Sequence, residues 1–224
     1  MGAKLLMNDR SVLINQLLQY ITENKKDKMF EVLAQRTNYV TIVLEDLFQP
    51  HNASAALRTC DIFGIQNIHV VETNYTFKPV DSVSMGSSKW VDIYRHSTIT
   101  DAIAQLKKQG YRIIATTPHQ QSYSLPELPL DFKTALLFGS EQVGLSPLAL
   151  EHADLFVKIP MFGFVESFNV SVSVALCLYD IMTRLHRSAY AWHLSEQEKQ
   201  ELLLKWICKT SKTAAAIAKQ ISND

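Results

Sequence analysis

Short apolar runs rich in β-branched residues recur along the chain and alternate with helical stretches of about 10 to 15 residues. The runs at 40–44 and 134–138 are almost entirely apolar, which is typical of strands buried on both faces of a sheet. This alternation predicts an α/β domain with a mostly parallel sheet. Strands are expected at 40–44, 67–71, 90–94, 111–115, 134–138 and 155–159.

Capping and breaking residues locate the helices. A helix at 53–63 is expected to end before Gly64, which suits the left-handed position after a helix, and Pro50 is expected to exclude a helix from the preceding loop. Ser195 and Glu198 predict a capping box. Other helices are expected at 100–109, 170–185, 195–208 and 211–221, with two short ones in 9–36 separated by the polar stretch 22–28, and a long loop at 73–89. The predicted organisation is a helical extension at 1–38, an α/β domain at 39–188 and a second helical extension at 189–224.

The composition indicates a globular protein without a global electrostatic preference. The chain has 224 residues, of which 47% are hydrophobic, and a formal net charge of +0. A nucleic acid would therefore have to be held by local basic patches. Three distant cysteines without a C-x-x-C motif predict neither a disulfide framework nor a zinc site. No apolar run approaches the ~18 residues that span a bilayer, so we expect a soluble cytoplasmic protein with no membrane or metal partner.

The segment 159–171, IPMFGFVESFNVS, has the layout of a ligand-binding loop. Its proline and glycine favour an irregular backbone, and Ser167 and Asn169 precede an apolar run at 170–185. A helix beginning near Asn169 would present unpaired N–H groups to an anion, a carboxylate or a ribose hydroxyl. The alternative is an ordinary buried helix preceded by a turn. The first five residues of the run alternate as in a strand, but its length favours a helix buried in a core or a subunit interface.

Two further motifs stand at strand-to-helix turns, at 45–60 (EDLFQPHNASAALRTC) and 138–146 (FGSEQVGLS). With 159–171, in this order and at these spacings, they resemble the three signature motifs of the SPOUT superfamily, the knotted S-adenosylmethionine-dependent RNA methyltransferases. The closest resemblance is to the tRNA (guanosine-2′-O)-methyltransferase branch, and it covers most of the chain. Ser140 departs from the Asn that some rRNA enzymes carry before the glutamate, and this change removes no expected catalytic group.

The resemblance implies an architecture as well as an activity. It implies an α/β domain whose C-terminal segment threads through a loop to form a deep trefoil knot, a topology otherwise almost absent from proteins. S-adenosylmethionine would bind within the knot of a homodimer, with each active site drawing on both subunits. The helix at 170–185 would lie in the dimer interface, although its low charge would also fit a monomer core.

The family pattern also implies catalytic residues. Its first-motif Asn and Arg match Asn52 and Arg58, and Arg58 is the expected main catalytic residue. The family mechanism lets this Arg activate the ribose hydroxyl, whereas its permanent charge and fork geometry favour clamping phosphate and lowering the hydroxyl's pKa. Glu141 is expected to orient the first-motif residues, and Ser167 and Asn169 match the family's residues near the reacting groups. Outside this context, Arg58 and Glu141 would be interpreted as members of surface ion pairs.

The resemblance also implies contacts to the cofactor and to RNA, but these contacts depend less on particular side chains than the catalytic ones do. Adenine needs main-chain hydrogen bonds in an apolar slot, and the matching positions are Thr116, Gly139, Ile159 and Phe168. Basic residues of the terminal helices and of the long helix are candidates for phosphate contacts, which would make RNA binding salt-dependent. The residues chosen are Arg10, Arg184 and Arg187, each of which could instead belong to a solvated helix face.

The predicted function is methyl transfer from S-adenosylmethionine to the ribose 2′-hydroxyl of guanosine 18 in the tRNA D-loop, with both helical extensions touching tRNA. Only 39 residues precede Val40, too few for the extra RNA-binding domain usual in the rRNA branch. The alternatives are methylation of rRNA or of another tRNA position, and RNA binding without catalysis, against which the intact motif residues argue. A nicotinamide-dependent oxidoreductase is disfavoured because no G-x-G-x-x-G follows the first strand.

Overall fold

The computed structural model describes residues 7–117 and 122–221, which form two compact units. Of the described residues, those between 37 and 192 form the sheet unit, and those at 7–36 and 193–221 together form the helical unit. The sequence pattern predicts helices in an extension at each end of the chain. In the structure they share one unit, because α1 (Met7–Leu18) contacts both α8 (Glu196–Thr210) and α9 (Lys212–Ile221).

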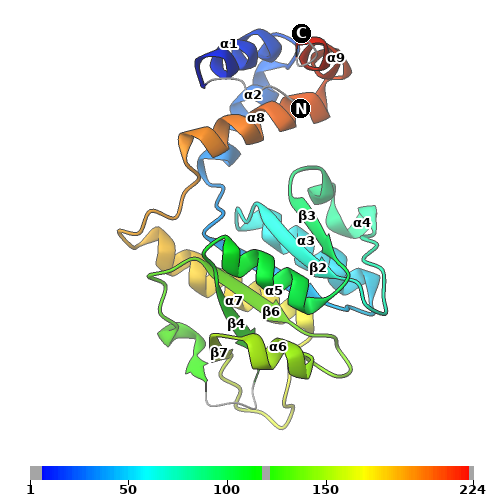
Figure 1. Cartoon of the computed structure of the whole chain (residues 1–224), viewed down its shortest axis with the longest axis vertical. Coiled ribbons are helices and arrows are strands. Elements are labelled where there is room, and N and C mark those ends of the chain that lie inside the picture. Colours follow the sequence, from blue (N-terminus) through cyan, green and yellow to red (C-terminus); the bar gives the residue numbers. More distant parts are fainter. Residues whose placement is uncertain (1–6, 118–121, 222–224) are drawn as a thin grey trace. The chain divides into compact units, whose positions relative to one another are not determined.

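A parallel sheet forms the centre of the sheet unit, which confirms the predicted α/β fold class (Figure 1). Within the described residues the strand order is β3-β2-β1-β6-β4-β7-β5, and neighbouring strands pair in parallel. The central strands β1 and β6 are fully buried, which explains their nearly continuous apolar sequence. The strands are β1 (Val40–Glu45), β2 (Asn67–Val71), β3 (Asp92–His96), β4 (Arg112–Thr116), β5 (Tyr123–Ser124), β6 (Thr134–Phe138) and β7 (Leu155–Lys158).

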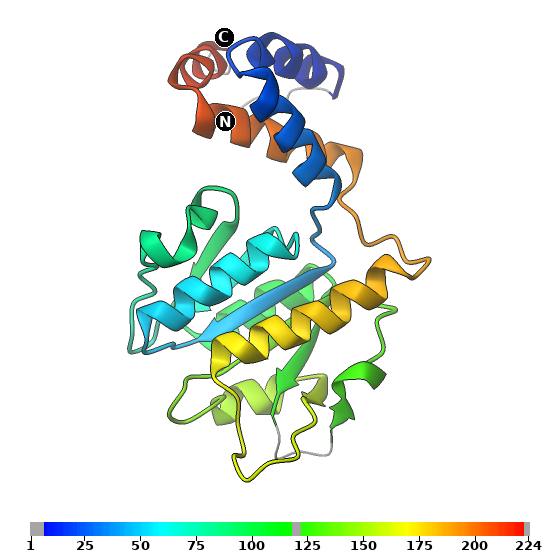
Figure 2. The ribbon, with the colours of Figure 1, turned by 180° about the vertical axis from the view of Figure 1, so that it is seen from behind.

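Helices cover both faces of this sheet. Figure 1 shows α5 (Ile99–Lys108) and α6 (Pro147–His152) on one face, and Figure 2 shows α3 (Pro50–Ile62) and α7 (Val170–His186) on the other. Alternate residues of β1 enter the two layers, since Ile42 packs in the core with α3 and α7 while Val43 packs with α5. The carboxyl ends of β1, β4, β6 and β7 meet at one edge of the sheet, and the loops that precede α3, α6 and α7 emerge there.

The expectation that Pro50 excludes a helix is wrong, because α3 begins at this residue. A proline at the first helical position loses no hydrogen bond, and its fixed φ suits the helix. The Pro50 carbonyl accepts a bond from the Ser54 hydroxyl at 2.6 Å. Asn52 therefore lies on the first turn of a helix instead of in a loop.

Other differences are local. Two helices form in this region as predicted, but the break between them lies at 19–22, because α2 (Glu23–Ala34) begins within the polar stretch 22–28 and pairs Lys26 with Glu23 at 2.7 Å. The expected loop at 73–89 contains α4 (Asp81–Ser84) and the 3-10 turn η1 (Ser87–Lys89), which delays β3 by two residues. Between β4 and β6, the described part of the connection contains β5 and the 3-10 turn η2 (Leu125–Glu127).

In the helical unit, α8 contacts α1, α2 and α9. The capping box at the start of α8 is confirmed, since the Glu198 N–H donates to Ser195 Oγ and the Ser195 N–H donates to Glu198 Oε2. Trp206 is buried here, with the Arg36 guanidinium 5.3 Å from its ring centroid. Across residues 7–117 and 122–221, no helix has both the length and the apolar character needed to cross a lipid bilayer.

Candidate active site

Hydrogen bonds between side chains link the three motifs at the carboxyl edge of the sheet. Asn52 Nδ2, on the first turn of α3, donates to Glu141 Oε1 at 2.6 Å. Asn169 Nδ2 donates to Asn52 Oδ1 at 3.1 Å. Asn169 Oδ1 accepts from the Ser171 backbone N–H at 2.9 Å and from its hydroxyl at 2.6 Å. Three residues predicted from distant motifs therefore form one network, which we call the amide chain: Glu141, Asn52 and Asn169.

The amide chain has a defined polarity. A carboxylate only accepts hydrogen bonds, so Asn52 must turn its NH2 group toward Glu141 and its oxygen toward Asn169. Glu141 Oε2 also accepts from the Phe48 backbone N–H at 3.3 Å. Asn169 caps α7 through its bond with the Ser171 N–H, which confirms the predicted helix start. The cap and the network thus hold Asn169 from both ends.

A buried carboxylate beside this network was not assigned a role from the sequence. Glu45, at the end of β1, is 7% exposed and accepts from the Ser146 N–H at 2.9 Å and the Ser146 hydroxyl at 2.6 Å. Ser146 also caps α6 by accepting from the Ala149 N–H. These bonds fasten the start of the first motif to the end of the second. A carboxylate ending a buried apolar strand was the available signal, because such a group needs hydrogen-bond partners.

A cavity of about 580 Å³ opens at the same edge, between the loops that follow β4, β6 and β7. The residues predicted to hold the cofactor all line it: Thr116, Gly139, Ile159 and Phe168. Three predicted catalytic residues share its wall: Glu141, Ser167 and Asn169. The described lining does not include Asn52 or Arg58.

The loop after β6 gives the cavity a wall made of backbone. Ser140 and Gly144 exchange backbone hydrogen bonds of 3.1 and 3.0 Å, and Gly144 has a left-handed φ of 71°. A Cβ on Gly139 would overlap the backbone of Gly144 and Leu145, so only glycine fits there. On the neighbouring strand, Thr116 Oγ1 donates to the Leu137 carbonyl at 2.6 Å, which ties the two loops together.

Arg58 lies apart from the amide chain. It is exposed on α3, six residues beyond Asn52, or about 9 Å along the helix axis. Within the part of the chain that the structure describes, its guanidinium makes no hydrogen bond or ion pair. The structure therefore brings together four of the five predicted catalytic residues, whereas Arg58 is exposed on α3 and lies outside the described cavity lining.

The three arginines predicted to touch RNA differ in their surroundings. Arg10 forms an ion pair with Glu201 at 2.9 Å, and its side chain is 11% exposed. Arg184 donates to the Leu125 carbonyl at 3.0 Å, to the Leu128 carbonyl and to Asp180 at 3.1 Å. Arg187 follows α7 and is exposed. RNA contact stays a prediction for all three, and exposure favours Arg187.

The reactive groups gathered at this edge are amides, carboxylates and hydroxyls. Cys60 is fully buried, and burial raises the pKa of the Cys177 thiol to about 12, with the Asp180 charge acting in the same direction. Neither thiol is therefore a nucleophile of this site. Among the described residues, no group of three or more His, Cys, Asp or Glu side chains could hold a metal ion.

Comparison with known proteins assigns the family. The model of the SpoU rRNA methylase family matches residues 39–179, which contain all three motifs. A Borreliella burgdorferi protein named tRNA (guanosine(18)-2′-O)-methyltransferase is 44% identical over 195 residues, covering 86% of this chain and 88% of its own. A Thermus thermophilus protein of the same name is 36% identical, covering 84% of this chain and 98% of its own.

A solved structure agrees with these matches. The crystal structure of the A. aeolicus TrmH/SpoU tRNA modifying enzyme has a TM-score of 0.75 at 30% identity, and the match covers 89% of this chain and 98% of that one. Fold, motifs and sequence thus lead to one conclusion: the chain belongs to the SpoU rRNA methylase family.

Proposed function

We propose that this protein transfers a methyl group from S-adenosylmethionine to the ribose 2′-hydroxyl of guanosine 18 in the tRNA D-loop. The observation that carries the proposal is the amide chain at the wall of the 580 Å³ cavity. The relatives named for this activity match nearly the whole chain, including both units. That extent of likeness supports tRNA over rRNA as the substrate.

The cavity fits S-adenosylmethionine in size and in chemistry. Its volume of about 580 Å³ lies within the usual range for small-molecule sites. Gly139 lets the backbone of Gly144 and Leu145 pack directly against its own and so shapes this wall of the cavity, and Ile159 and Phe168 supply apolar surface for an adenine ring. We assign cofactor contacts to these three residues and to the backbone at Thr116. When bound, the cofactor supplies a methyl group made electrophilic by a sulfonium centre.

The protein is proposed to contribute to the reaction by orienting the target ribose and by placing a positive charge near it. The ribose oxygen would have to lie in line with the methyl–sulfur bond, which breaks as the new C–O bond forms, and the hydroxyl proton would pass to water. Ser167 and Asn169, on the cavity wall, are proposed to hydrogen-bond the target ribose. Asn52 and Glu141 keep the Asn169 amide in one orientation through the amide chain.

Arg58 is proposed to bind a phosphate beside the target ribose and to lower the pKa of the 2′-hydroxyl. Its guanidinium stays protonated in proteins, so an electrostatic role is favoured over proton abstraction. The absence of an ion-pair partner among the described residues supports this role, because the charge is available to RNA.

A homodimer is also proposed. Arg58 does not belong to the described lining of its own chain's cavity, which supports a site completed by α3 of a second protomer. The surface of α3 and α7 carries exposed apolar side chains, with Ile62 68%, Tyr179 63% and Val172 43% exposed. Exposed apolar groups clustered on packed helices are typical of subunit interfaces.

The remaining proposals concern tRNA, topology and location. The helical unit and Arg187 would contact tRNA, with Arg10 and Arg184 in supporting positions. The chain after β7 would complete a trefoil knot, and the meeting of three loops around one cavity supports this topology. Action on tRNA implies a cytoplasmic location.

The direct test uses methyl-labelled S-adenosylmethionine and unmodified tRNA transcripts. After nuclease digestion, the label should appear in 2′-O-methylguanosine from position 18. Label on a base would contradict the ribose assignment, and label only in rRNA fragments would favour the rRNA alternative. RNA binding without any transfer would indicate a non-catalytic RNA-binding protein.

A further inference from the structure

An aromatic pair stands beside the amide chain without a role in the proposed chemistry. Phe48 and Tyr75 meet edge to face, with ring centroids 5.0 Å apart and an interplanar angle of 72°. Their side chains are 48% and 40% exposed, whereas the neighbouring Leu47 is buried in the core. Two rings held partly in water, while the next residue enters the core, present a π surface outward.

Both rings are anchored through their backbones. The Phe48 N–H donates to Glu141 Oε2 at 3.3 Å, so this residue is bonded directly to the amide chain. The Tyr75 N–H donates to Asp46 Oδ1 at 2.8 Å. Asp46 also accepts from the Asn74 backbone N–H and side-chain amide, and it holds a left-handed φ of 55°, rare for a non-glycine residue. The surrounding bonds maintain this conformation and keep the rings in place before a ligand arrives.

The chemistry around the pair selects a neutral, flat ligand. The anchoring groups, Asp46 and Glu141, are carboxylates, and their charge disfavours a phosphate at this position. The flanking residues Gln49, Asn74 and Thr76 are polar and exposed, so neither ring continues into an apolar run along the chain. This contrasts with the broader apolar surface on α3 and α7. A nucleobase has the size, the flat face and the neutrality that fit, and unpaired bases commonly stack on aromatic side chains in RNA recognition.

We propose that Phe48 and Tyr75 form a stacking site for an unpaired base next to the methylated nucleotide. The inference rests on the proposed action on RNA and adds a positioning contact to it. Because Phe48 shares a hydrogen bond with Glu141, a base stacked on its ring would lie close to the network that orients the target ribose. By holding the neighbouring base, the pair would determine which nucleotide of the RNA loop places its ribose at the cavity.

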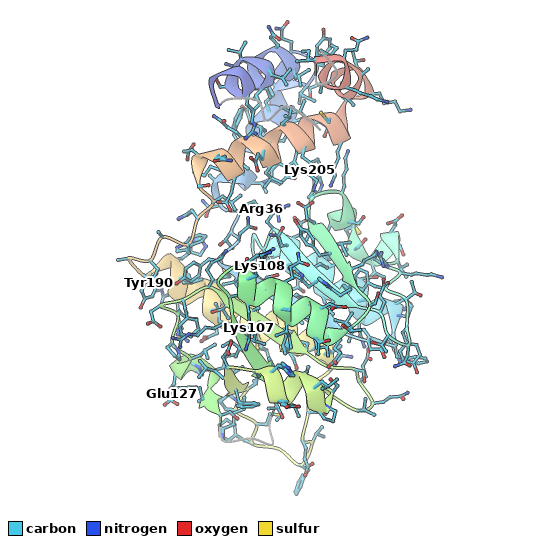
Figure 3. All side chains as sticks on the ribbon, in the orientation of Figure 1. Arg36, Lys107, Lys108, Glu127, Tyr190 and Lys205 are labelled. Atoms are coloured by element: carbon cyan, nitrogen blue, oxygen red, sulfur yellow. The ribbon has the colours of Figure 1, made fainter. Side chains whose placement is uncertain are left out.

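The test compares side chains that differ in π surface. Phe48→Leu keeps apolar bulk and the backbone N–H that bonds Glu141 but removes the ring, while Phe48→Trp keeps a ring. The matched control is Tyr190→Leu, since Tyr190 is 45% exposed and lies in the segment after α7 (Figure 3). The RNA is a tRNA transcript with 2-aminopurine beside the target guanosine, and its fluorescence reports stacking.

Removal of one base-stacking side chain weakens binding about 5- to 150-fold. We expect Phe48→Leu to raise the KM for tRNA about tenfold and to abolish most of the 2-aminopurine change. Phe48→Trp and Tyr190→Leu should have the wild-type KM and fluorescence change. The turnover of Phe48→Leu at saturating tRNA should stay within about twofold of the wild type. The same comparison is made on the second ring with Tyr75→Leu, which removes the ring, and Tyr75→Phe, which keeps it.

Three results discriminate among the explanations. A Phe48→Leu protein with wild-type KM and fluorescence change overturns the stacking site while leaving the proposed methyl transfer intact. If Phe48→Leu shifts the sedimentation of the protein toward monomer, and RNA binding falls only to the extent that the dimer dissociates, then Phe48 lies in a contact with a second copy of the chain. That result also overturns the stacking site. A wild-type protein that shows the fluorescence change but transfers no methyl supports the stacking site and contradicts the proposed function.

Discussion

At the scale of single residues, the site depends on the orientation of one amide. Asn52 donates to Glu141 and accepts from Asn169, so both ends of its side chain are used. An amide satisfies a carboxylate on one side and a second amide on the other, which neither an Asp nor an Ala can do. Removing one partner leaves another without its hydrogen bond, and water replaces part of that loss because Glu141 and Asn169 are exposed.

Asn52→Asp tests this arrangement. The new carboxylate would face Glu141 in place of a donor now at 2.6 Å, and the repulsion should displace Asn169. We expect turnover to fall about 100-fold with little change in cofactor affinity. Like charges raise the pKa of one carboxyl, so the residual activity should increase as pH falls toward 6. A rate for Asn52→Asp that follows the wild-type pH profile would contradict the network.

Gly139→Ala tests the backbone wall of the cavity. Its Cβ would overlap the backbone of Gly144 and Leu145, whereas a Cβ at Gly163 meets nothing within 4 Å. We expect Gly139→Ala to lose about 1 to 3 kcal/mol of unfolding free energy and most of its cofactor binding. Gly163→Ala is the matched control. Urea unfolding and calorimetric titration with S-adenosylmethionine measure both effects, and equal behaviour of the two variants would contradict the predicted overlap.

Residue types were predictable here, but their pairings were not. The motif likeness selected Asn52, Glu141 and Asn169, which the structure brings into contact. It did not indicate which amide donates to which group, because that depends on backbone positions set by distant segments. The Glu45–Ser146 bonds and the Phe48–Tyr75 contact were missed for the same reason, since each joins residues far apart in sequence.

At the scale of elements, local sequence patterns predicted the strands and helices correctly where burial of apolar side chains or helix capping determines the structure. β2 and β6 begin and end at the predicted residues because their apolar runs are bounded by turns. α7 forms despite the alternation in its first residues, because Asn169 caps it and one buried face continues to Leu185. The predictions of a loop at Pro50 and at α4 were wrong. In both places the residue composition is typical of a loop, but the position of each residue in the turn allows a helix to begin.

The outer strands β2 and β3 carry a pair of histidines with a consequence for stability. His69 is 2% exposed, and its Nδ1 lies 2.9 Å from Nε2 of His96. Its ring also stacks on Tyr94 with centroids 5.0 Å apart. Burial lowers the pKa of His69 to about 4, and the neighbouring His96 acts in the same direction. Burial also lowers the pKa of His96, while Asp101 acts against that shift.

These shifts predict how stability changes with pH. The unfolded chain has a His pKa of about 6.5, so between pH 6.5 and 4 it binds a proton that folded His69 does not. Stability contributed by neutral His69 is complete above pH 6.5 and falls by up to about 1.4 kcal/mol per pH unit below it. Urea unfolding from pH 7.5 to 4.5 measures this slope. His69→Gln should have a shallower slope, and an unchanged slope would contradict the assignment.

At the scale of the whole molecule, the two ends of the chain fold into one helical unit. The sequence pattern identified α1, α2, α8 and α9 as helices, but their mutual packing depends on contacts between residues almost a chain length apart. Arg10 pairs with Glu201 across that separation. No local sequence signal indicates such a contact, so the sequence predicts the helices of the two extensions but not that they pack as one unit.

The proposed dimer leads to a prediction at this scale. Ile62→Asp combined with Tyr179→Asp places charge on two side chains that are 68% and 63% exposed on α3 and α7. If they are buried between subunits, unpaired charges there should prevent assembly. We expect a monomer that binds S-adenosylmethionine but transfers no methyl. Val12→Asp, at a side chain 56% exposed on α1, is the control for sedimentation. A dimeric double variant would contradict the interface.

Methylation of a ribose oxygen by this site can be tested by removing a single oxygen atom from the substrate. A tRNA carrying 2′-deoxyguanosine only at position 18 keeps the base, the phosphates and the fold of the substrate but lacks the 2′-hydroxyl. We expect this tRNA to compete with normal tRNA, with only the small loss of affinity that one missing hydrogen bond causes, and to receive no methyl group. Transfer of labelled methyl to the deoxy-substituted tRNA at the normal rate would contradict ribose methylation.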